Sequence, residues 1–119
     1  MAKSIVDEKS YSFAIKIVEM YKQLTEAKRE YVLSRQLLRS GTAIGALVRE
    51  AEHAQSKPDF LNKMNIALKE ANETLYWLSL LKDTGYLHEE AFELIHNPAT
   101  EIVKLLASIV KTTKTNLGK

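Results

Sequence analysis

The stretch that decides the fold is YVLSRQLLRSGTAIGALVREAEHAQ, residues 31–55 of a 119-residue chain. At about 100° per residue, an α-helix places the large apolar side chains of this stretch on one face. Ser40 and Gly41 fall on the same face, and small residues there let another helix approach closely. The opposite face carries arginines and small residues, namely Arg35, Arg39, Thr42, Ala46, Arg49 and His53. The pattern predicts a long helix with a core side and an arginine side.

The composition favours a single helical domain. A chain of this length buries roughly two-thirds of the surface that it exposes when unfolded, and it has four glycines and two prolines. The absence of cysteine excludes thiol catalysis, disulfides and cysteine-ligated zinc. A net charge of +2 gives no whole-molecule argument for nucleic acid. No apolar run reaches the roughly 18 residues of a membrane span, so we expect a soluble cytoplasmic protein with no membrane partner.

The apolar periodicity predicts helices over about residues 7–27, 31–55, 58–82 and 89–114. A polar connection ends the first helix, a serine cap with Asp59 starts the third, and Gly85 stops it. Pro98 lacks an N–H group, so we expect the fourth helix to be kinked or broken there. Long helices with short connections predict an all-α, up-down-up-down four-helix bundle that forms one domain.

The first predicted helix has a second apolar flank, Tyr11, Ile15 and Val18, well round from its core face. Such residues are either scattered surface hydrophobes or a contact with a neighbouring subunit, and the sequence leaves both readings open. Together with the small residues Ser40 and Gly41, they form the predicted oligomer interface.

Arg35, Arg39 and Arg49 are the best candidates for a nucleic-acid-binding surface, because arginines along one helical face can contact phosphates. The same arginines can instead pair with acidic residues of a neighbouring subunit. A mixed-charge helix face can also be merely solvated. The sequence does not decide among these three readings.

The sequence gives little support for catalysis or a metal site. Glu50-x-x-His53 and Glu93-x-x-His96 match the spacing of di-iron ligands in helical bundles. However, both motifs lie away from the apolar stripes of their helices, and no inward glutamate completes the set. There is no G-x-S-x-G motif and no Gly-rich phosphate loop. We therefore predict a non-enzymatic protein with no catalytic residues, no metal and no cofactor.

Two segments carry a resemblance, SRQLLRSGTAIGALVREAEHAQSKPDF and MNIALKEANETLYWLSLLKDTGYL. They resemble the bacterial four helix bundle protein family, which includes proteins encoded by intervening sequences within large-subunit ribosomal RNA genes. The accessory variability protein of diversity-generating retroelements is a relative. The likeness runs from about Ser10 to Lys114, although Ala43 and Leu47 stand where the family usually has serine and asparagine.

The resemblance implies a small bundle that assembles into a ring, commonly a pentamer. In some members of that family the ring binds nucleic acid or a reverse transcriptase. We therefore expect a homo-oligomeric assembly or binding module, with RNA or DNA as a candidate partner. The alternative is an adaptor that recruits a polymerase or another protein without contacting nucleic acid.

Overall fold

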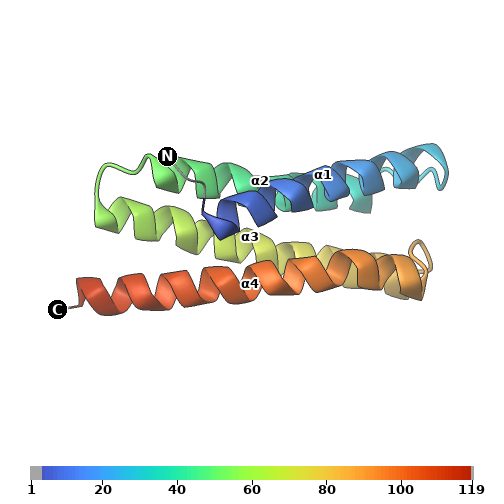
Figure 1. Cartoon of the computed structure of the whole chain (residues 1–119). Helices are drawn as coiled ribbons and strands as arrows, with labels where there is room; N and C mark the ends of the chain where they lie inside the picture. Colours follow the sequence, from blue (N-terminus) through green and yellow to red (C-terminus); the bar gives the residue numbers. More distant parts are fainter. Residues whose placement is uncertain (1–3, 119) are drawn as a thin grey trace.

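A computed structural model describes residues 4–118 and shows antiparallel helices packed side by side (Figure 1). The helices are α1 (Ile5–Glu26), α2 (Leu33–Glu52), α3 (Lys57–Asp83) and α4 (Glu89–Leu117). Each helix packs on the next, and α4 also packs on α1, in a bundle measuring 50 × 24 × 22 Å. This arrangement confirms the predicted up-down-up-down bundle. As a result, α1 begins and α4 ends at the same end of the molecule (Figure 1).

Serine caps and one glycine set several helix ends. The hydroxyls of Ser4 and Ser56 each accept a hydrogen bond, at 3.1 Å, from the backbone N–H three residues later, which satisfies a free donor of the first turn. Gly85 follows α3 with a φ of 89°, a left-handed conformation that suits glycine. The predicted restart at residues 56–59 and the predicted stop at Gly85 are both confirmed.

The connection before α2 contains a buried carboxylate, Glu30, that caps the start of the helix. Glu30 is only 7% exposed, and its carboxylate accepts backbone hydrogen bonds from Val32, Leu33 and Ser34 at 3.1, 2.9 and 2.6 Å. These are N–H groups at the start of α2, which have no partner within the helix. Glu30 therefore fixes where α2 begins, two residues later than predicted.

The break allowed for at Pro98 does not occur, and α4 continues through the proline as one helix. Proline removes one backbone hydrogen bond, to the carbonyl four residues earlier. On either side of it, Ile95, Ala99 and Ile102 are buried in the core. Packing of this continuous apolar stripe offsets the missing hydrogen bond.

The small residues of α2 lie inside the bundle. A Cβ atom on Gly41 would lie 2.8 Å from Cγ1 of Ile17, so α1 approaches the α2 backbone closely there. Ser40 is fully buried, and its hydroxyl accepts a 3.0 Å hydrogen bond from Thr74 of α3. The close neighbours of Ser40 and Gly41 are thus helices of the same chain. This corrects the prediction that places these two residues at an interface between subunits.

Replacement of Gly41 by leucine is expected to destabilise the fold by about 1–3 kcal/mol, because the added carbons overlap Ile17 in a filled core. Chemical denaturation followed by circular dichroism measures the change. Ala107→Leu adds a similar volume at an exposed position of α4 and should leave the midpoint almost unchanged. Equal midpoints for Gly41→Leu and wild type would show that α1 does not contact α2 closely.

Candidate functional site: the outer face of α1 and α2

The structure places the apolar flank of α1 beside the arginine side of α2. Tyr11, Ile15 and Val18 are exposed by 52%, 46% and 37% and recur at one-turn spacing. A shallow hollow joins this flank to α2, lined by Tyr11, Ala14, Thr42, Gly45, Ala46 and Arg49. We call the combined surface the α1–α2 face. It consists of Tyr11, Ile15, Val18, Arg35, Arg39, Thr42, Ala46 and Arg49.

Close packing of the two helices makes this face continuous. A Cβ on Gly45 would lie 3.3 Å from the backbone oxygen of Ser10, and a Cβ on Gly41 would meet the side chain of Ile17. The two glycines, four residues apart, therefore bring α2 against α1 over a full turn. The contact also fixes the position of α2 relative to α1 along the bundle axis, because Ser10 lies opposite Gly45 and Ile17 lies opposite Gly41.

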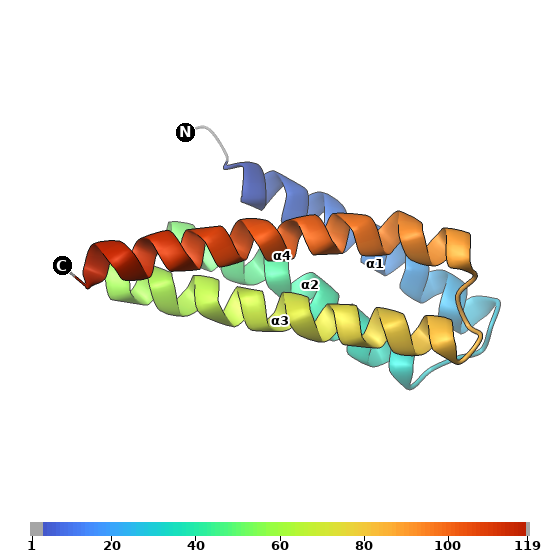
Figure 2. The same cartoon turned by 90° about the horizontal axis from the view of Figure 1, so that it is seen from below.

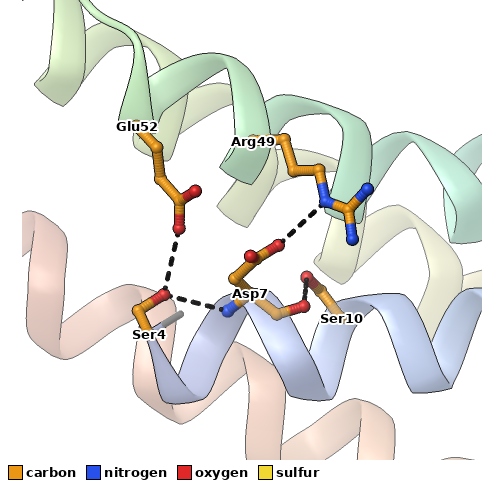
Figure 3. A network of polar contacts seen from close by, with 5 residues as sticks. All are labelled: Ser4, Asp7, Ser10, Arg49 and Glu52. Carbon is orange, nitrogen blue, oxygen red and sulfur yellow. Dashed lines mark hydrogen bonds and ion pairs between the residues drawn. The ribbon is translucent and has the colours of Figure 1, made fainter. Parts of the chain in front are cut away.

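Arg49 is held at one end of the α1–α2 face. Its Nε donates to Oδ1 of Asp7 at 3.2 Å (Figure 3), and its guanidinium lies 4.7 Å from the ring centroid of Tyr11. The side chain of Asp7 is 3% exposed, whereas that of Arg49 is 46% exposed. Arg49 therefore neutralises a buried carboxylate and orients Tyr11, which is a structural role that the sequence does not indicate.

Further polar contacts stabilise the start of α1 at the same end of the bundle. Ser4 of the α1 cap donates to Glu52 at 3.4 Å, and Ser10 donates to the backbone oxygen of Asp7 at 3.1 Å (Figure 3). Asp7 stands in the first turn of α1, where its negative charge also suits the positive end of the helix dipole. The available signal was its spacing from Ser10 and Ala14, which places Asp7 on the side of α1 that packs against α2.

The other two arginines differ from Arg49. Arg35 and Arg39 are exposed, and neither makes an ion pair within residues 4–118. They lie one turn apart and continue the stripe that contains Arg49. The α1–α2 face therefore combines an apolar flank on α1 with two outward-facing cations on α2.

The two Glu-x-x-His motifs do not come together. Glu50 pairs with Lys63 at 3.4 Å, and His96 stacks on Phe92 with a centroid distance of 4.6 Å. Across residues 4–118 there is no group of three or more histidine or acidic side chains that could hold a metal ion.

Over the described residues 4–118, no helix has both the length and the apolar character needed to span a bilayer.

The comparisons with known proteins agree with the fold. Residues 2–108 match the family model of the 23S rRNA-intervening sequence protein. A crystal structure of a protein of unknown function from the S23 ribosomal protein family of Bacteroides thetaiotaomicron VPI-5482 is 59% identical, with a TM-score of 0.89. The alignment covers 90% of this chain and 99% of that one. A search of curated proteins finds no match. The chain belongs to the 23S rRNA-intervening sequence protein family.

Proposed function

We propose that this protein is a non-enzymatic module that assembles with copies of itself through the α1–α2 face. The observation that carries the proposal is the exposure of Tyr11, Ile15 and Val18 as one stripe, whose Tyr11 end contacts Arg49 of the arginine stripe on α2. Grouped exposed apolar residues are typical of protein contacts. Tyrosine and arginine are also enriched where protein interfaces form.

Nucleic acid is the second candidate partner, because Arg35 and Arg39 are exposed and lack acidic partners in the described part of the chain. Two features favour the protein contact. Arg49 is already engaged with Asp7, which leaves only two arginines of the stripe for phosphates. The apolar stripe next to them gains nothing from a phosphate backbone, whereas it is covered when another copy binds.

Replacement of Ile15 and Val18 together by aspartate is expected to dissociate the assembly. Wild type should elute with a mass several times 13.5 kDa in size exclusion coupled to light scattering, and the variant with 13.5 kDa. Both side chains are exposed, so the helical circular dichroism spectrum should be retained. Tyr76→Asp, at a 60% exposed position of α3, is the matched control and should keep the wild-type mass.

A monomeric wild type at tens of micromolar would contradict the proposed assembly. The adaptor role, in which the α1–α2 face binds a different protein, would then become the stronger reading.

Titration of labelled RNA and DNA at two salt concentrations tests the second candidate. Binding through a few phosphate contacts would be weak, about 10⁻⁴ to 10⁻⁶ M, and would fall steeply with salt. Arg35→Glu/Arg39→Glu should lose the assembled mass if both arginines lie in the subunit contact. Loss of nucleic-acid binding with the mass unchanged would instead assign them to phosphates.

A further inference from the structure

One end of the bundle contains a cavity that shares no residue with the α1–α2 face. In Figure 2, the end of α1, the connection from α3 to α4 and the start of α4 lie at the same end of the molecule. These three segments enclose a cavity of about 210 Å³, which we call the end cavity. Its walls are mainly apolar and are formed by Met20, Leu24, Tyr86, Leu87 and Ala91.

Hydrogen-bonded turns hold the walls of the end cavity in place. After α1, the N–H of Lys28 donates to the carbonyl of Gln23 at 3.3 Å. After α3, the N–H groups of Tyr86 and Leu87 donate to the carbonyl of Leu81 at 2.9 and 3.3 Å. This second turn brings both side chains back against the core of the bundle. The cavity therefore has its shape before any ligand binds, which lowers the cost of ordering on binding.

The rim of the end cavity is polar and carries a positive charge. Lys28 and His88 are exposed and line the cavity, whereas no aspartate or glutamate lines it. Lys28 makes no ion pair within residues 4–118. The acid that follows His88, Glu89, is itself paired with Lys82 at 3.5 Å. An ammonium group and an imidazole beside an apolar wall suit a ligand with an anionic head and an apolar tail.

The end cavity continues along the seam between α1 and α4. A second hollow of about 320 Å³ shares Met20 and Ala91 with it, among others. Along α4 the two hollows are lined by residues within 88–95, a length of about 10 Å in a helix. The charged residues that line the second hollow, Lys16 and Glu19, have opposite signs. An unbranched apolar chain that starts at the rim can therefore follow the seam past Ala91.

We propose that the end cavity binds a free, medium-chain aliphatic carboxylate. The carboxylate lies at the rim, where the ammonium group of Lys28 and a ring N–H of His88 donate to it. The chain packs against Met20 and Ala91 and continues along the α1–α4 seam. The two hollows lie end to end, which suits one chain rather than the two chains of a membrane lipid.

Titration with octanoate and decanoate below their micelle concentrations, followed by methyl NMR of methionine, tests the proposal. The methyl signal of Met20 should shift on binding. Met64, buried near the start of α3 and away from the cavity, is the internal reference and should not shift. Decanoate should bind about 15-fold more tightly than octanoate, because each additional buried methylene strengthens binding about fourfold.

Substitutions locate the head and the chain of the ligand. Lys28→Glu should weaken decanoate binding about fivefold, as expected for the loss of an exposed charge pair. Lys22→Glu makes the same charge change at an exposed position of α1 outside the cavity and should leave the affinity unchanged. Ala91→Leu fills the junction of the two hollows, so decanoate should lose its advantage over octanoate. Circular dichroism checks that each variant remains helical.

Several outcomes would overturn the proposal. The first is a Met20 signal that does not shift with wild type, or that shifts only together with the signal of Met64. The second is equal weakening by Lys28→Glu and Lys22→Glu, which would mean that general charge and not the rim attracts the carboxylate. The third is decanol binding as tightly as decanoate, which would show that the site takes an apolar chain without an anionic head. If Ala91→Leu does not fold, the two lysine variants and the chain-length dependence in wild type still decide.

Discussion

Replacement of Glu30 by alanine is expected to destabilise the fold by about 2–4 kcal/mol. A lost helix cap costs roughly 0.5–2 kcal/mol, but Glu30 accepts hydrogen bonds from three successive backbone amides rather than one. The amide of Ser34 lies in a buried residue, where an unsatisfied donor costs about 1–3 kcal/mol. Urea denaturation should therefore show a lower midpoint with a nearly unchanged slope.

Two further variants identify the cause of this loss. Glu30→Gln keeps one accepting oxygen and should fall between wild type and Glu30→Ala. Glu26→Ala removes an exposed carboxylate from the last turn of α1 and should change the midpoint little. If Glu26→Ala cost as much as Glu30→Ala, general electrostatics rather than capping would explain the effect.

The same carboxylate predicts a pH dependence. Burial alone would raise the pKa of Glu30, but the hydrogen bonds from the Leu33, Ser34 and Val32 amides outweigh it, so the pKa lies below its ordinary value of 4.5. A pKa lowered by folding means that the stabilisation is fully present above about pH 4.5 and is lost as the pH falls through the folded-state pKa. The stability difference between wild type and Glu30→Gln, measured by urea denaturation from pH 3 to 7, should therefore shrink at the acidic end.

The fold was predictable because its determinants are repetitive. Each helix carries an apolar stripe at a period of 3.6 residues, and serine or glycine marks several of the helix ends. The prediction failed where a single tertiary contact decides the outcome. Nothing local to Pro98 shows that α4 continues through it while Ile95, Ala99 and Ile102 pack in the core. Similarly, the polar segment before α2 does not reveal that Glu30 folds back onto the helix start.

In the candidate site, too, periodicity predicts some features whereas tertiary contacts decide the others. The exposure of Tyr11, Ile15 and Val18 follows from the periodicity of α1 alone. The sequence could not show that this flank lies beside Arg49, because that depends on which sides of α1 and α2 meet. Nor could it show whether the small residues of α2 face a helix of the same chain or of another. In the bundle, Gly41 meets Ile17 of the same chain.

Replacement of Arg49 by methionine is expected to destabilise the fold by about 2–3 kcal/mol, because it leaves the carboxylate of Asp7 buried without its partner. Removing one member of a buried ion pair costs roughly 3–5 kcal/mol. The lower value is expected here because Arg49 is 46% exposed, so that water reaches the site once the guanidinium is gone. The position of Asp7 in the first turn of α1 also stabilises its negative charge through the helix dipole.

A double-mutant cycle with Asp7→Asn separates the ion pair from simple loss of packing. Asp7→Asn removes the buried charge, so Arg49→Met should cost much less in that background than in wild type. The double variant should then be more stable than Arg49→Met alone, since no uncompensated carboxylate remains in it. Urea denaturation at neutral pH provides all four free energies of unfolding. Equal costs of Arg49→Met in the two backgrounds would mean that Arg49 contributes by covering Tyr11, 4.7 Å away, and not by neutralising Asp7.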